Sequence, residues 1–162
     1  MKFVFSMIFI LVLLFFQIGI LPHLAIFEVY PNIIFVCFMS LVILRGFKKS
    51  ITWAIVAGLF LDFYSLNNIV GIFVVCFLLS SYFVFFLSQN IFKKSNLSSV
   101  IPVFLLTTGF YNLLVLVFHK IFGLEFEFGV LTFLINVAYN TIIAIPVFYL
   151  IKKYYARKSD KI

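Results

Sequence analysis

Residues 45–62 read RGFKKSITWAIVAGLFLD, and this stretch changes in character from one end to the other. It opens with three basic side chains, continues through an almost uninterrupted apolar run and ends on a carboxylate. Short loops that are rich in lysine and arginine stay on the cytoplasmic side of a membrane. The stretch therefore predicts a helix that crosses a membrane from the cytoplasm to the outer face.

Apolar runs of the same kind recur along the whole chain. Six of them are separated by short, more polar segments, at about residues 3–21, 29–44, 51–66, 70–87, 100–118 and 130–151. A helix needs about 20 residues to cross the roughly 30 Å of hydrocarbon in a bilayer. We therefore expect an all-α integral membrane protein with six transmembrane helices, in which residues 1–162 form a single transmembrane domain.

The charged residues divide between two alternating sets of connecting segments. One set holds eleven of the twelve lysines and arginines, and the other holds only Lys120, together with Glu28, Asp62, Glu125 and Glu127. The basic set is expected to be cytoplasmic, so both the N-terminus and the C-terminus should lie in the cytoplasm. Because losing one run would destroy this separation, the first run is expected to remain as an uncleaved anchor.

The composition excludes several classes of protein. Hydrophobic residues make up 65% of the chain, charged residues make up 10%, and the mean hydropathy is +1.27, which is far from the composition of a soluble globular domain. The net charge of +7 does not indicate a nucleic-acid binder, because the basic residues lie at helix ends, where they can contact anionic lipid. Membrane lipid is an expected partner, and nucleic acid is not.

The third apolar run carries small side chains and one carboxylate on a single helical face. Ala54, Gly58 and Asp62 are spaced by four residues, and Ser65 extends the face. Small residues at this spacing let two helices approach closely. Because the run has only 16 residues, about 24 Å of helix, it is expected to be buried among its neighbours. Asp62 has two interpretations: it accepts hydrogen bonds from the loop that follows, or it binds a partner or ligand.

A second polar set lies in the last two apolar runs. If their hairpin is symmetric about Leu124, then Asn112 lies at the depth of Asn136, and Thr108 lies at the depth of Asn140. On each helix the two polar residues are four apart, so the two stripes can meet and form hydrogen bonds between the helices. These four side chains either join the helices or line a polar ligand pocket.

The sequence offers no set of residues suited to catalysis. An intramembrane aspartyl peptidase needs two facing aspartates, and the only other aspartate, Asp160, lies in the cytoplasmic tail. The histidines and acids near the outer face do not have the spacing of metal ligands such as His-x-x-x-His. We therefore expect no enzyme activity, no cofactor and no metal.

Three stretches together resemble the rod-shape-determining MreD family of bacteria. They are Arg45-Gly46 followed by Gly58-Leu59-Phe60-Leu61-Asp62, Ser65 and Gly71; Pro31-Asn32 ahead of a short apolar run; and Asn140-Thr141-Ile142-Ile143-Ala144-Ile145-Pro146. The similarity covers about residues 31–148, and the chain length and number of apolar runs also fit. The chain departs from the family pattern in its asparagine-rich segment 63–69 and in its high phenylalanine content.

The resemblance implies a multi-pass protein of the bacterial inner membrane that is not an enzyme. Such a protein would act as a scaffold of the cell-elongation machinery and would bind an MreC-like single-span protein. Directly or through that partner, it would help a RodA-type glycosyltransferase and a class B penicillin-binding transpeptidase to insert peptidoglycan and maintain cell shape.

The resemblance also implies a fold like that of the six-helix substrate-binding subunits of energy-coupling-factor vitamin transporters. A vitamin-binding transport subunit is therefore the alternative function. The outer loops of this chain are short and poor in ligand groups, which favours the scaffold.

Overall fold

The computed structural model describes residues 2–64, 70–91, 97–123 and 129–159, and these residues are helical almost throughout. Six α-helices follow one another in the described residues: α1 (Lys2–Gly19), α2 (Ile33–Arg45), α3 (Phe47–Tyr64), α4 (Ile72–Phe86), α5 (Leu97–Ile121) and α6 (Val130–Ser159). A 3-10 helix, η1 (Leu21–Leu24), precedes α2, and a π-helical segment, η2 (Leu87–Ile91), follows α4. The described residues contain no β-strand, so the all-helical prediction is confirmed for them.

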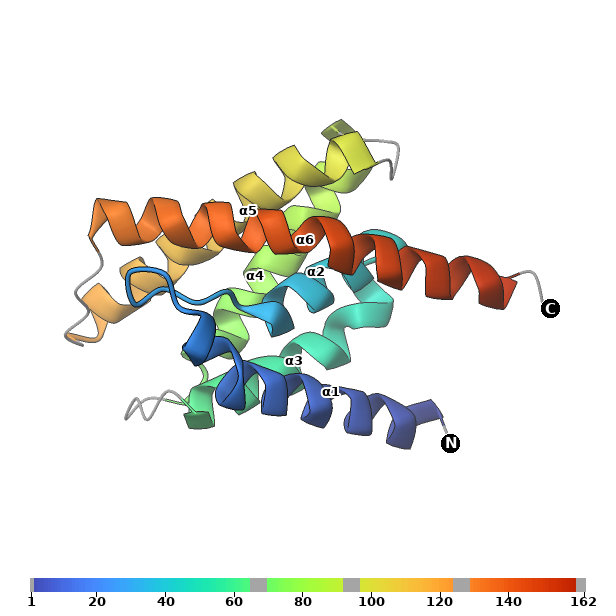
Figure 1. The fold of residues 1–162 in the computed structure, drawn as a ribbon, viewed down its shortest axis with the longest axis horizontal. Helices are drawn as coiled ribbons and strands as arrows, with labels where there is room; N and C mark the ends of the chain where they lie inside the picture. Colours follow the sequence, from blue (N-terminus) through green and yellow to red (C-terminus); the bar gives the residue numbers. More distant parts are fainter. Residues whose placement is uncertain (1, 65–69, 92–96, 124–128, 160–162) are drawn as a thin grey trace.

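The helices differ in whether they can span a membrane alone. Among the described residues, three helical segments are long and apolar enough to do so: Ile72–Asn90, Ser99–Ile121 and Val130–Tyr154. α2 has only 13 residues, about 20 Å of helix. The six helices alternate in direction along the bundle, and the start of α1 and the end of α6 lie at the same end of the molecule (Figure 1).

α2 lies at the centre of the bundle. It contacts α1, α3, α4 and α6, and in Figure 1 it runs between α6 on one side and α1 and α3 on the other. Its nine residues 34–42 are all buried. An apolar helix that is too short to reach both faces of a bilayer is stable where other helices surround it.

The expectation that the third apolar run would be the buried helix is wrong. α3 exposes Ile55, Leu59 and Phe63 and buries one face, which consists of Ser50, Ala54, Ala57, Gly58, Leu61 and Asp62. The physical reason is length, because α3 also includes the basic turn before the apolar run and reaches 18 residues, about 27 Å of helix. The shorter α2 takes the shielded position.

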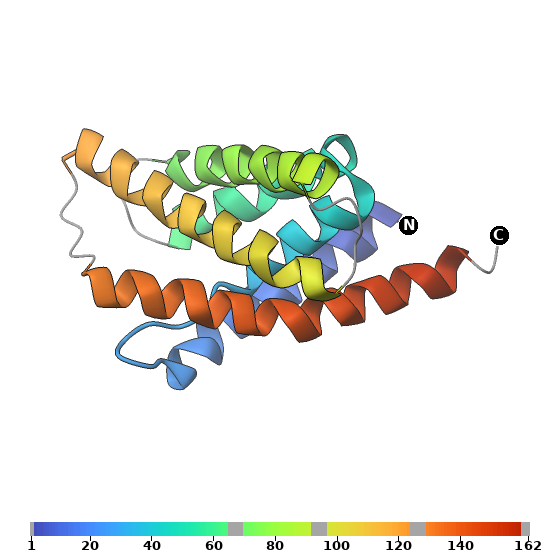
Figure 2. The ribbon, with the colours of Figure 1, turned by 90° about the horizontal axis from the view of Figure 1, so that it is seen from above.

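Aromatic rings from α2, α4 and α5 pack together in the core. The centroid of the Phe35 ring lies 4.5 Å from that of Tyr111 and 5.7 Å from that of Phe77, and the Phe38 and Phe77 centroids are also 5.7 Å apart. These three phenylalanines are at most 3% exposed. Because lipid is as apolar as the core, it is close packing of such rings, more than the hydrophobic effect, that joins helices in a membrane. α5 also contacts α6, so it packs between α4 and α6 (Figure 2).

α3 and α4 come into backbone contact at Gly58. A β-carbon built on Gly58 would lie 2.5 Å from the Cα atom of Val74 and 2.8 Å from its backbone nitrogen. Backbone atoms cannot turn aside as a flexible side chain can, so any larger residue would push α4 away. Glycine at this position sets the distance between the two helices.

We expect Gly58→Ala to destabilise the protein, because even one methyl group collides with the α4 backbone and overpacking of this kind costs about 1–3 kcal/mol. The matched control is Gly109→Ala, since a β-carbon there would meet only the Phe133 ring, at 3.9 Å, and alanine is the better helix former. Thermal unfolding of the purified variants in detergent measures the difference. Equal melting temperatures would show that α3 and α4 tolerate a wider spacing.

Candidate functional site

Asp62 lies one turn beyond Gly58 on the same face of α3, and its carboxylate reaches the start of α4. The side chain is 2% exposed. Its Oδ1 atom accepts a hydrogen bond from the Phe73 N–H at 2.9 Å, and its Oδ2 atom accepts one from the Val74 N–H at 3.4 Å. Both N–H groups belong to the first turn of α4, where a helix has no acceptors of its own and its dipole favours a negative charge. Asp62 therefore caps α4 from the neighbouring helix.

These bonds bear on the two interpretations that the sequence left open for Asp62. They give the carboxylate a structural role, in which backbone N–H groups of α4 are donors. Ser65, which was predicted to extend the same face, lies outside the described residues. Ala54, two turns before Asp62, is fully buried. Binding of a partner or ligand by this face stays a prediction.

Asparagines connect α5 to α6, and α6 to α2. Asn112 Nδ2 donates to Asn136 Oδ1 at 3.0 Å, as their equal depth predicts. Asn140 Nδ2 donates to the same Oδ1 atom at 2.8 Å and to the Asn136 carbonyl at 2.9 Å. Asn140 Oδ1 in turn accepts a hydrogen bond from the backbone N–H of Asn32 at 2.8 Å. The polar stripe thus continues beyond the predicted helix pair to the start of a third helix.

Side chains from α1, α2 and α6 satisfy the backbone at the start of α2. Asn32 is the N-cap, and its Oδ1 atom accepts a hydrogen bond from the Phe35 N–H at 3.0 Å. Gln17 of α1 accepts one from the Ile33 N–H at 2.8 Å. Together with the bond from Asn32 to Asn140, three N–H groups that a helix start leaves open are paired inside the protein. This pairing matters in a bilayer, where no water replaces a missing acceptor.

Sequence reasoning missed Gln17 and the capping role of Asn32. Gln17 is 4% exposed and also donates to the Pro31 carbonyl at 3.1 Å. Two signals in the sequence indicate these roles. Gln17 is the only amide side chain in the first apolar run, residues 3–21, and an asparagine directly before an apolar run, such as Asn32, is a typical N-cap.

The predicted pairing of Thr108 with Asn140 is wrong. Thr108 is fully buried, and among the described residues its Oγ1 atom has no hydrogen-bond partner. The Asn140 amide bonds instead to Asn136 and to the start of α2. Equal depth along two helices did not guarantee that both polar pairs would form.

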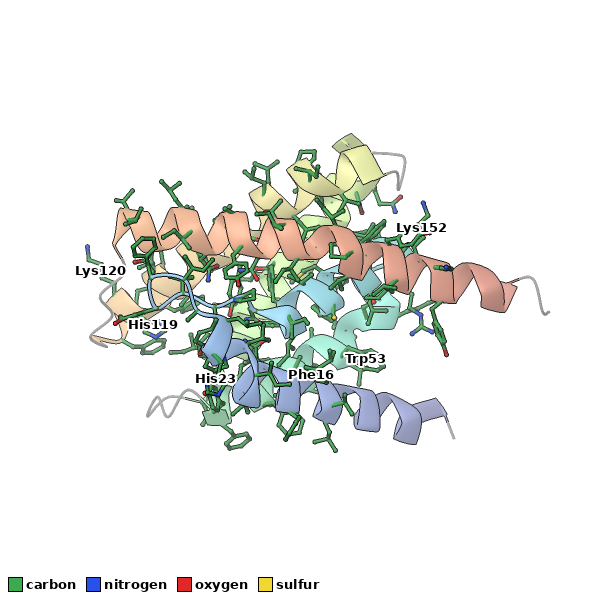
Figure 3. All side chains as sticks on the ribbon, viewed as in Figure 1. Phe16, His23, Trp53, His119, Lys120 and Lys152 are labelled. Atoms are coloured by element: carbon green, nitrogen blue, oxygen red, sulfur yellow. The ribbon has the colours of Figure 1, made fainter. Side chains whose placement is uncertain are left out.

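The remaining polar and titratable groups do not gather into a metal site in the part of the chain that the structure describes. Cys37 and Cys76 are separate, buried thiols. His119 is buried at the end of α5, with Nδ1 2.8 Å from the Val115 carbonyl (Figure 3). Glu125 and Glu127, which the sequence places near the outer face, lie outside the described residues.

Comparison with known protein families gives a match over almost the whole chain. A family model described as rod shape-determining protein MreD matches residues 1–154. The matched residues run from α1 through most of α6 and include the Asp62 and asparagine contacts described above. No curated protein and no solved structure matches the chain, so the likeness to subunits of vitamin transporters stays a prediction.

We expect Asn140→Leu to lower the melting temperature, because it leaves the Asn32 N–H without this acceptor, and an unsatisfied buried group costs about 1–3 kcal/mol. Thr108→Val is the control in the same helix pair: it removes a hydroxyl that bonds to none of the described residues and should be neutral or stabilising. Thermal unfolding in detergent and in lipid nanodiscs measures both variants. A loss for Thr108→Val as large as that for Asn140→Leu would contradict the assigned hydrogen bonds.

Proposed function

The chain belongs to the MreD family of rod shape-determining membrane proteins, and we propose that it is a non-enzymatic scaffold subunit of the bacterial cell-elongation machinery. In this role it binds an MreC-like single-span protein and supports peptidoglycan synthesis by a RodA-type glycosyltransferase and a class B penicillin-binding transpeptidase. The observation that carries the proposal is the family match over residues 1–154.

The use of the buried polar side chains supports a scaffold. Asp62, Gln17 and Asn140 bond to helix starts, and Asn112 bonds to the neighbouring helix. Side chains that join helices in this way fix the shape of the outer surface. A protein that works by presenting surfaces to partners needs that rigidity.

The surface that remains is apolar and suits partners inside the membrane. α1, α5 and α6 each expose rows of large apolar side chains, which include Phe15, Leu113 and Leu134. A single-span partner offers one apolar helix, and such helices associate by close packing within the bilayer. We therefore propose that the buried residues among the candidates for helix packing or partner binding act in internal packing, and that the exposed apolar side chains meet the partner. These buried residues are Ala54, Gly58, Asp62, Thr108, Asn112 and Asn140.

We infer that all six helices cross the bacterial inner membrane as one transmembrane domain, with both termini in the cytoplasm. Lys152 lies toward the end of the molecule where α1 starts and α6 ends, whereas His119 and Lys120 lie at the opposite end (Figure 3). Arg45, at the end of α2, belongs to the basic set that the charge rule places in the cytoplasm. The short α2 would cross inside the surrounding helices.

Reporter fusions test this topology. Fusions after Lys49, Lys94 and Ile162 are expected to report the cytoplasm, because the basic segments are retained there. Fusions after Asn68 and Gly123 are expected to report the outer side. A fusion after Lys94 that reported the outer side would mean that α3 and α4 do not both cross.

Depletion in a rod-shaped host and purification from its membranes test the function. A scaffold of wall elongation acts by binding partners, so its loss is expected to round the cells. The tagged protein is expected to co-purify with a single-span partner whether or not a vitamin is added. The Gly109→Ala variant serves as a tagged control with intact packing.

The alternative transport subunit predicts different results. Its depletion would leave cell shape unchanged, and it would co-purify with ATPase subunits. A bound vitamin at 100 times its dissociation constant would also stabilise it by about 2.7 kcal/mol. Reproducible stabilisation by a vitamin together with normal cell shape would overturn the proposed function.

A further inference from the structure

A short hairpin between α1 and α2 has an unusual turn. Ile26 and Val29 exchange both backbone hydrogen bonds, at 2.9 and 3.0 Å. Between them, Phe27 and Glu28 have φ angles of 49° and 65°. Two consecutive left-handed residues are the hallmark of a type I′ turn, which favours Asn-Gly or similar small pairs. Here both positions carry larger side chains.

The surroundings of the hairpin hold it in this strained conformation. Val29, on one side of the turn, is 5% exposed and anchors the hairpin in the protein. Just before the hairpin, the Tyr139 hydroxyl of α6 donates to the carbonyl of Leu24, the last residue of η1, at 2.9 Å. Backbone strain of this kind persists only where neighbouring contacts determine the conformation, and it is often tied to function.

The result of this strain is that apolar side chains are held away from the body of the protein. Phe27 is 77% exposed, Leu24 is 55% exposed and Ile26 is 50% exposed. Phe15 and Ile18, near the end of α1, are exposed apolar residues as well. Apolar side chains in this number are unfavourable in water and indicate a surface that something covers.

The location and the chemistry both favour lipid as the cover. His23, just before the hairpin, lies toward the end of the molecule where His119 and Lys120 end α5 (Figure 3). The inference rests on the topology proposed above, which places this end at the outer boundary of the bilayer. The facing backbone groups of Ile26 and Val29 are paired with each other, so they can enter an apolar region without leaving these groups unsatisfied.

We propose that Leu24, Ile26 and Phe27 insert into the outer leaflet, at the boundary between headgroups and acyl chains. Apolar and aromatic side chains bind there, while the neighbouring polar groups of His23 and Glu28 stay among the headgroups. The hairpin precedes the N-cap of α2 by only a few residues, so this anchor fixes the depth at which the short central helix starts.

A single-tryptophan reporter tests the insertion. Trp53 is the only tryptophan in the chain, so Trp53→Phe combined with Phe27→Trp places the one fluorophore at the hairpin tip. The full chain is reconstituted alone in phosphatidylcholine–phosphatidylglycerol vesicles. We expect brominated lipids to quench the tip, more strongly when the bromines lie near the carbonyl end of the acyl chain than near its tail, and aqueous iodide to quench it weakly.

The control places the fluorophore near the cytoplasmic end of α6. Trp53→Phe combined with Tyr154→Trp puts it at a 56% exposed position next to Lys153, where iodide should quench it and bromines in the chain tail should not. A second measurement avoids Trp53→Phe altogether. A spin label at Phe27→Cys, on a background in which Cys37 and Cys76 are replaced by alanine, should be more accessible to oxygen than to a water-soluble nickel chelate.

Two outcomes would overturn the proposal. One is a hairpin tip that iodide and the nickel chelate reach freely in vesicles that contain the protein alone. The other is a tip that becomes protected only when a partner protein is added, which would assign the hairpin to protein docking.

Discussion

The first N–H groups of α2 and α4 have no acceptors within their own helices, and the bilayer interior offers no water in their place. The protein meets this constraint with side chains from other helices. Asp62 of α3 accepts hydrogen bonds from the start of α4, whereas Gln17 of α1 and Asn140 of α6 accept them from the start of α2. A helix held in this way cannot move without opening buried bonds, so the helix starts fix the arrangement that apolar packing then fills.

Hydrogen bonds and close packing act together at the α3–α4 contact. Gly58 lets the two backbones meet, and this approach brings the α4 start within reach of the Asp62 carboxylate one turn later. A wider spacing would cost both the packing and the cap. The small residue Gly58 and the acid Asp62 therefore act together to fix the position of α4 against α3.

The sequence predicts the local features of this protein well, because they depend on residues close together in the chain. The apolar runs predict the helices. The assumed symmetry of the connection between α5 and α6 about Leu124 predicts the hydrogen bond between Asn112 and Asn136. It does not predict which helix becomes central, since α3 gains length from a basic turn and α2 does not. Nor does it predict that Asn140 bonds to the start of α2 and not to Thr108: periodicity tells which residues share a helix face, but not which helix that face will meet.

The bond between Asn32 and Asn140 joins residues that are 108 positions apart. During synthesis the start of α2 therefore leaves the ribosome long before its acceptor on α6 exists. Until α6 is made, the Asn32 N–H lacks the acceptor that this helix supplies. The order of translation thus makes the last helix the one that completes the hydrogen bonds at the start of the central helix.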